Sequence, residues 1–179
     1  MQRFVAFLGG INVGGHRVRG PALAAEFTAL GYTDVATFLA SGNVVFSTED
    51  APAELVTSIE KQLAAALGYA VPTYLRTADQ VHSIAAQRPF PASVIEASRG
   101  KLQVAMLRDP PDAAARTTVQ ELSSDQDRLA LDGTELYWLP SGGVSESELD
   151  LNTLFTALGP STMRTANTVR RIAAKFLTD

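Results

Sequence analysis

The order in which strand and helix signals follow one another constrains the fold of this chain more than any single motif does. A β-branched and aromatic run, Arg3–Leu8, leads into glycines and predicts a strand. Gly20-Pro21 then favours the start of a helix, because proline suits the first helical positions, and Gly31 favours its end. The signals that follow predict a hairpin of two strands, a second helix and a closing strand, at Asp34–Leu39, Val44–Ser47, Pro52–Gly68 and Val71–Arg76.

The second half of the chain repeats this order. Lys101–Leu107 predicts a strand, with Leu102, Val104 and Met106 on one side. A helix is expected to open at Asp109-Pro110 and to reach about Leu122. Asp132-Gly133 is a strong signal for the turn of a hairpin. The remaining signals predict the two strands of that hairpin at Arg128–Leu131 and Glu135–Leu139 and a last strand at Thr162–Arg164. A capping box at Ser145–Glu148 precedes a helix with Leu151, Leu154, Phe155 and Leu158 that stops at Gly159.

Both halves therefore follow the order β-α-β-β-α-β, which is that of ferredoxin-like folds. We predict an α+β protein with two ferredoxin-like units in tandem, each a mainly antiparallel sheet with helices on one face, plus a C-terminal helix. The units are expected at residues 3–76 and 101–164, with 77–100 as a connector that begins with a short capped helix and 165–179 as the closing helix. The length of 179 residues favours a single domain. The halves share this order rather than close sequence identity.

Composition excludes several classes of active site. The chain has no cysteine, which removes disulfides, thiolate nucleophiles and cysteine-bound metals, and it has only two histidines, His16 and His82. We therefore expect neither a metal nor a bound cofactor. The net charge of −4 argues against a globally basic nucleic-acid-binding protein. No apolar run approaches the roughly 18 residues of a membrane span, and the N-terminus lacks the features of a signal peptide, so we expect a cytoplasmic protein without membrane contact.

A glycine-rich segment after the first strand is the most unusual stretch of the sequence. It contains Gly10, Asn12, Gly14, Gly15 and Arg17. Glycines expose backbone N–H groups to a ligand, and the arginine adds a positive charge that suits phosphate or carboxylate. The spacing matches neither a Walker loop nor the dinucleotide-binding G-x-G-x-x-G pattern. A strand exit that needs glycine only for its backbone dihedral angles is the alternative interpretation.

Two further segments carry candidate site residues. Ser41 and Asn43, in the loop of the first hairpin, can present a hydroxyl and an amide to a ligand, but the same residue types also stabilise turns by bonding to their own backbone. Arg164 lies in a locally basic stretch near the C-terminus, where Thr165 or Asn167 is expected to cap the last helix and leave N–H groups for an anion. The alternative there is a solvated helix face whose arginines balance an acidic segment earlier in the chain.

Three sequence words, taken in order, carry a resemblance to a known family. They are Gly10–Gly15, Ser41–Phe46 and Thr165–Val169, and together they resemble the bacterial family named domain of unknown function 1697. The resemblance extends from Phe4 to about Leu177. It implies two ferredoxin-like units and no particular activity. It also implies that the polar residues of the three words form one shared site, namely Asn12, Ser41, Asn43 and Asn167.

The chain departs from the family pattern at three places. Gly9 stands where the family usually has arginine, Phe38 where tyrosine is common, and Thr165-Ala166 near the place where the family has an arginine, an asparagine and an aromatic residue in succession. If the family site uses that first arginine for an anion, another arginine must replace it here. The candidates are Arg17, Arg19 and Arg164.

The leading hypothesis is a non-metal binding protein, with or without catalysis, for a phosphate-bearing small molecule or a nucleotide. The Gly9–Gly15 backbone and Arg17 would hold the anion, and the pocket would be completed by Asn12, Ser41, Asn43, Arg164 and Asn167. A nucleic-acid-binding protein is an alternative, since RNA-recognition modules share the element order, although no segment matches their aromatic motif. A third alternative is an interaction or oligomerisation module that uses sheet edges or Tyr137-Trp138. The oligomeric state stays open.

Overall fold

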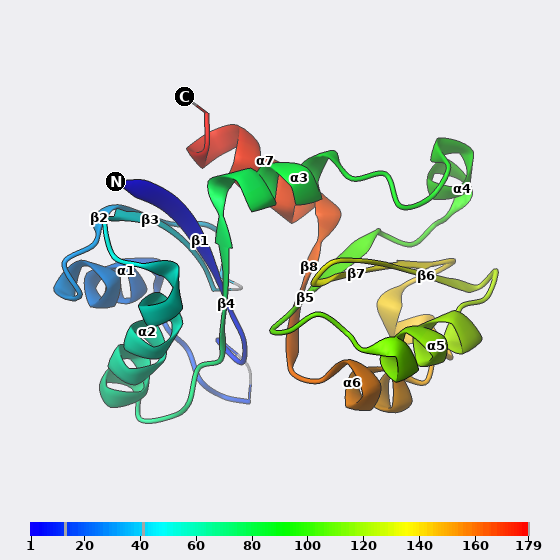
Figure 1. Ribbon diagram of the computed structural model, residues 1–179, viewed down its shortest axis with the longest axis horizontal. Coiled ribbons are helices and arrows are strands. Elements are labelled where there is room, and N and C mark those ends of the chain that lie inside the picture. Colours follow the sequence, from blue (N-terminus) through cyan, green and yellow to red (C-terminus); the bar gives the residue numbers. More distant parts are fainter. Residues whose placement is uncertain (13, 41, 179) are drawn as a thin grey trace. The chain divides into compact units, whose positions relative to one another are not determined.

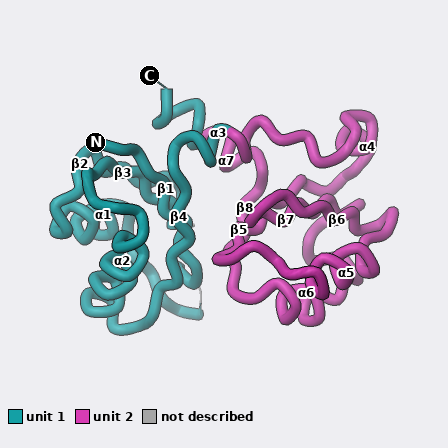
Figure 2. Tube along the Cα trace, viewed as in Figure 1, with its two compact units in different colours: residues 1–82, 172–179 teal, residues 83–171 magenta. Residues whose placement is uncertain are grey.

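A computed structural model describes residues 1–12, 14–40 and 42–178 of the chain (Figure 1). The chain divides into two compact units (Figure 2). Unit 1 comprises residues 1–82 and 172–179, and unit 2 comprises residues 83–171. No helix in the described part of the chain is both long and apolar enough to span a bilayer.

Unit 1 is built on a four-stranded antiparallel sheet with the order β2-β3-β1-β4. Two helices, α1 and α2, pack on one face of this sheet (Figure 1). Side chains alternate along β1, so Phe4, Ala6 and Leu8 point into the core that these helices cover. The elements are β1 (Gln2–Leu8), α1 (Gly20–Ala29), β2 (Thr33–Thr37), β3 (Asn43–Thr48), α2 (Pro52–Leu67) and β4 (Thr73–Thr77).

Aromatic rings fill the centre of this core. Phe46 stacks on Tyr32 with ring centroids 4.7 Å apart, and it contacts Phe27 at 5.3 Å and Phe4 at 5.8 Å. Burial and, to a smaller extent, the nearby Asp50 raise the pKa of Tyr32 above its ordinary value, as expected for a phenol within an apolar core.

Unit 2 repeats this architecture. Its antiparallel sheet has the order β6-β7-β5-β8, so its four strands are arranged as the four strands of the unit 1 sheet are. Helices α5 and α6 pack in its core. The predicted fold class, two ferredoxin-like units in tandem, is therefore confirmed. The elements are β5 (Gln103–Leu107), α5 (Ala113–Leu122), β6 (Asp127–Asp132), β7 (Glu135–Pro140), α6 (Leu151–Leu158) and β8 (Ser161–Thr165).

The C-terminal helix α7 (Ala166–Phe176) contributes residues to both units, because the division falls between Arg171 and Ile172. In unit 1 its end is tied to the sheet, since Arg3 Nε donates to the Phe176 carbonyl over 3.3 Å. The Phe176 ring also meets Phe38 edge-on, with centroids 5.8 Å apart. The C-terminal segment is thus held against β1 and against the loop that follows β2.

Several predicted element ends differ from the structure. The segment predicted to be a connector contains α4 (Ala92–Ala97) as well as the expected short helix, α3 (Ala78–Ala86). Helix α5 starts later than Asp109-Pro110, because a second proline follows Pro110 and disfavours helical dihedral angles there. Asp112 caps this helix instead, by accepting from Ala115 N over 2.8 Å.

The helix predicted behind Ser145 also begins later. The residues after Gly143 form a single 3₁₀ turn, η1 (Val144–Glu146), and Asp150 caps α6 by accepting from Thr153 N over 2.9 Å. Of the two caps left open for α7, the structure uses Thr165, whose hydroxyl accepts from Thr168 N over 3.1 Å.

Candidate functional site

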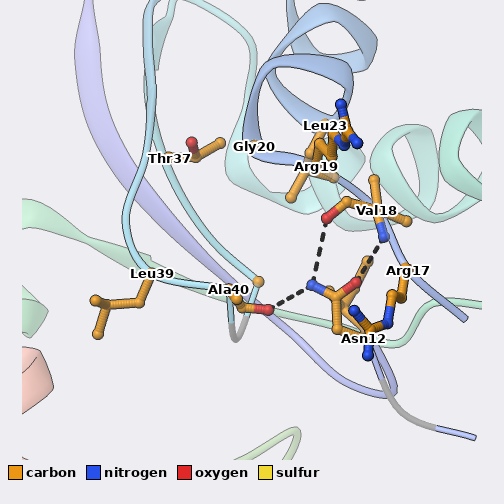
Figure 3. A pocket seen from close by; sticks show the side chains of 11 residues that line it. Asn12, Arg17, Val18, Arg19, Gly20, Leu23, Thr37, Leu39 and Ala40 are labelled. Atoms are coloured by element: carbon orange, nitrogen blue, oxygen red, sulfur yellow. Dashed lines mark hydrogen bonds between the residues drawn. The ribbon is translucent and has the colours of Figure 1, made fainter.

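Two loops of unit 1 meet at one end of its sheet. Residues 9–19 connect β1 to α1, and residues 38–42 connect β2 to β3. The antiparallel pairing of β1 with β3 places Phe7 opposite Asn43, and Leu8 N donates to the Gly42 carbonyl over 2.8 Å. The loops border a half-open cavity of about 710 Å³. Figure 3 shows Arg17, Val18 and Arg19 on one side of this cavity and Thr37 and Leu39 on the other.

The amide of Asn12 holds the two loops together. Its Nδ2 donates to the Ala40 carbonyl over 2.6 Å and to the Val18 carbonyl over 3.3 Å, and its Oδ1 accepts from Val18 N over 2.6 Å (Figure 3). Asn12 has a φ of 56°, in the left-handed region that asparagine tolerates better than most residues. Both ends of the amide are thus engaged by backbone, and Asn12 shapes the cavity by joining the two loops. A role for Asn12 in ligand recognition stays a prediction.

Glycine is required at one position of the lining. Gly42 has a φ of 75°, and a Cβ there would lie 3.1 Å from the Cβ atoms of Leu8 and Ile11. The two loops approach each other closely at this point, so the cavity depends on Gly42. At Gly20 a Cβ would lie 2.7 Å from Thr37 Oγ1, so the start of α1 also lies close to the end of β2.

The charge of the lining is positive. Arg17 and Arg19 are exposed, and neither guanidinium forms a hydrogen bond or an ion pair with any residue that the structure describes. The described lining contains no carboxylate. Arg19 is also the N-cap residue of α1, where it provides no capping hydrogen bond. Its cation therefore lies at the positive end of a helix dipole, an arrangement that a bound anion would stabilise.

The rest of the lining is largely apolar. Ile11 and Leu23 are buried, Val18 is partly buried, and Leu39 is 51% exposed. Thr37 supplies a hydroxyl. This combination of apolar walls with a few polar groups is typical of sites for small organic molecules.

The predicted site residues of unit 1 have different environments. Asn12 and Arg17 line the cavity, whereas Gly10, Gly14 and Gly15 lie in the same loop outside the described lining. These three glycines have φ angles of 70°, 60° and 89°, as a strained strand exit requires. Asn43 is fully buried, and its amide donates to the Phe38 carbonyl over 2.8 Å. Ser41 lies outside the described residues.

Arg164 and Asn167 belong to unit 2. Arg164 is buried, and its Nη1 donates to Thr162 Oγ1 over 2.9 Å and to the Met163 carbonyl over 2.8 Å. Burial lowers the pKa of Arg164 to about 10. Asn167 is exposed in the first turn of α7. Their joining the unit 1 residues in one pocket stays a prediction.

Most of the described lining was not among the predicted site residues, including Arg19, Thr37 and Leu39. Arg19 was named from the sequence only as a possible replacement for the family arginine. Thr37 and Leu39 had no signal, because β2 was expected to run to Leu39 whereas it ends at Thr37. The sequence also suggested Tyr137-Trp138 as a contact surface, but both are buried, at 2% and 1% exposure, and neither is available for one.

Comparisons with known proteins agree with the fold. A family model described as "Protein of unknown function (DUF1697)" matches residues 1–137. Among solved structures, the chain is similar to the conserved bacterial protein SP0830 from Streptococcus pneumoniae, with 23% sequence identity, a TM-score of 0.80 and coverage of 99% of each chain. No curated protein matches the sequence. At this level of identity the structural likeness establishes the fold alone.

Proposed function

Because this chain belongs to the DUF1697 family, described as proteins of unknown function, we propose a function from its cavity alone: it binds a small phosphate-bearing molecule in unit 1. Arg17 and Arg19 contact the anionic group. The observation that carries the proposal is the pair of exposed guanidinium groups, which have no hydrogen-bonding or ionic partner among the described residues and line a cavity without a described carboxylate.

Arginine is well suited to this role. Its planar guanidinium can donate two parallel hydrogen bonds to phosphate, and a hydrogen bond to a charged group contributes about 1.5–3 kcal/mol. The first turn of α1 contains no acidic residue that would neutralise either arginine. A phosphate group would therefore find unneutralised cations and the positive end of a helix dipole in the lining of this cavity.

The position of Arg19 supports the same proposal. Ser, Thr, Asp and Asn stabilise helix N-termini, and both long helices of unit 2 begin behind an aspartate, Asp112 or Asp150. Helix α1 instead begins behind an arginine that gives no cap. A residue that costs stability where better ones exist is a common feature of binding sites.

Binding and charge removal test the proposal together. We would titrate inorganic phosphate, adenosine monophosphate and ribose 5-phosphate into the wild-type protein and into the Arg17→Gln, Arg19→Gln double variant, by calorimetry and thermal shift. At least one probe should bind the wild type and raise its melting temperature, with binding weakened at least about tenfold in the double variant.

The matched control is Lys61→Gln, which removes one positive charge from an exposed position of α2 outside the described lining. This variant should bind as the wild type does. Absence of any thermal shift at 10 mM probe, or equal loss in the control, would contradict the proposal. Salt-sensitive retention of single-stranded RNA without binding of the small phosphates would favour the nucleic-acid alternative.

A further inference from the structure

The lining residues other than the two arginines indicate which class of phosphate-bearing molecule the cavity fits. Resting on the proposed function, we infer that the bound molecule is an amphipathic phosphate ester, whose phosphate contacts the arginines and whose apolar or aromatic group packs on the remaining walls. Sugar phosphates and free phosphate are then weak ligands of the same site.

The size of the cavity is the first argument. Its volume of about 710 Å³ far exceeds the space that a phosphate ion occupies and lies in the range of sites for organic molecules of drug size. A phosphate held at Arg17 and Arg19 would leave most of that volume for the rest of the ligand. Figure 3 shows this remaining space bounded on its far side by Thr37 and Leu39.

The scarcity of free polar groups is the second argument. A sugar needs hydrogen-bonding partners for each hydroxyl, since a buried polar group without one costs free energy. The amide of Asn12 is already bonded at both ends, which leaves the Thr37 hydroxyl as a side-chain partner away from the arginines. The side chains of Ile11, Val18 and Leu23 offer only apolar contact. The lining therefore matches an apolar group better than a polyhydroxylated one.

The conformation of Leu39 is the third argument. Its φ of 59° lies in the left-handed region, which leucine rarely adopts, and half of its side chain is exposed. Two contacts hold the preceding residue, Phe38, in place. Its N donates to the Asn43 carbonyl over 3.0 Å, and its ring packs on Phe176. The fold thus holds an apolar side chain in solvent, in an unfavourable backbone conformation, at the edge of the cavity. Strained residues of this kind cluster where ligands bind.

Two phosphate monoesters of equal charge separate the apolar contribution from the ionic one. We would titrate 1-naphthyl phosphate and glycerol 3-phosphate at pH 8, where both are dianions, into the wild type, Leu39→Asn and the Arg17→Gln, Arg19→Gln double variant. Asparagine tolerates left-handed dihedral angles, so Leu39→Asn keeps the loop conformation and removes the apolar surface. Thermal unfolding confirms that each variant is folded.

In the wild type, 1-naphthyl phosphate should bind about tenfold tighter than glycerol 3-phosphate, and Leu39→Asn should lower that ratio to about threefold or less without weakening glycerol 3-phosphate. Equal affinities in the wild type would overturn the inference and leave phosphate binding intact. Binding of 1-naphthyl phosphate that survives the double arginine variant would overturn the proposed function and show an apolar site only. If neither ester binds at 10 mM, both are wrong.

Discussion

The two units share a sheet order and differ in the loops at one end of the sheet. In unit 1, residues 9–19 and 38–42 connect the strands and helix at the cavity, whereas the corresponding connections in unit 2 are residues 108–112 and 133–134. Leu8 N and Leu107 N donate to the equivalent carbonyls, Gly42 and Thr134, over 2.8 Å in both units. The central strand of each sheet is thus bonded in the same way at this end. The cavity of unit 1 arises from lengthened loops and not from the fold itself.

The starts of the helices differ between the units in a similar way. Asp112 and Asp150 cap α5 and α6 in unit 2, whereas α1 and α2 in unit 1 begin behind Arg19 and Ala51 without a side-chain cap. Proline at the first helical positions partly replaces the missing caps. The helices of unit 2 therefore begin behind stabilising side-chain caps, whereas the equivalent positions in unit 1 carry residues that provide none. The following predictions test this comparison.

Truncation of the aromatic core should give the largest effect. Phe46 pairs with Phe4 in unit 1 at the register where Trp138 pairs with Gln103 in unit 2. Phe46 is fully buried among rings, so Phe46→Ala should lower the free energy of unfolding by about 3–5 kcal/mol. The matched change, Trp138→Phe, mainly removes the hydrogen bond from the indole N–H to Asp127 and should cost about 1–3 kcal/mol. Urea denaturation measures both, and equal losses would contradict the predicted ranking.

Removal of the Asn12 amide, which joins the two loops, should give the second-largest loss of stability. Asn12→Gly keeps the left-handed backbone but removes three hydrogen bonds, to Val18 and Ala40, and should cost about 2 kcal/mol because the site is partly exposed. Hydrogen exchange of the Val18 amide should become faster, and phosphate binding should weaken. Unit 2 amides should keep their protection. A variant with unchanged exchange at Val18 would show that Asn12 does not hold these loops.

A smaller change in stability, with a large change in binding, is expected at the start of α1. Arg19→Asp supplies the side-chain cap that Asp112 gives α5 and should stabilise the protein by about 1 kcal/mol. The same change places a carboxylate beside the cavity, so phosphate binding should be lost. Arg19→Gln, which removes the charge without adding a strong cap, should weaken binding with little change in melting temperature. If Arg19→Asp raised stability and still bound phosphate, Arg19 would have no part in the site.

Much of the fold could be predicted from the sequence, because strands and helices here carry strong local signals. Strand β1 is a short apolar run that leads into glycines, and α2 begins with a proline and ends at Gly68 in a left-handed conformation. Helix α4 was missed because its six residues follow Pro91 and are too few to show a helical period. The element order showed that the halves are related, but their residue-by-residue alignment needed the strand registers, which align Val5-Ala6 with Val104-Ala105 and Arg76-Thr77 with Arg164-Thr165.

The candidate site was harder to predict because residue type does not reveal which hydrogen-bonding partner a polar side chain has in the fold. Asn12, Asn43 and Arg17 were all reasonable ligand-binding residues by chemistry. In the structure the two asparagines bond to backbone, whereas the arginine has no partner among the described residues. No sequence signal indicated Leu39 as a lining residue. Its place in the cavity depends on β2 ending at Thr37 and on a backbone conformation that no sequence pattern for leucine predicts.

The smallest predicted effect concerns the acid dependence of the unit 2 caps. Thr153 N and Thr153 Oγ1 donate to the carboxylate of Asp150 and lower the pKa of that group below its ordinary value of about 3.9. The folded state therefore favours the ionised form, and the cap contributes stability above the unfolded pKa that is lost as the pH falls through the folded pKa. Asp150→Asn caps without titrating, so the wild type should be slightly more stable than this variant at pH 6, and the difference should shrink at pH 2.5. Urea midpoints at the two pH values measure the change. Helix α2, with no titratable cap at Ala51, gives no such contribution, so a difference that stayed constant with pH would mean that the Asp150 cap does not depend on charge.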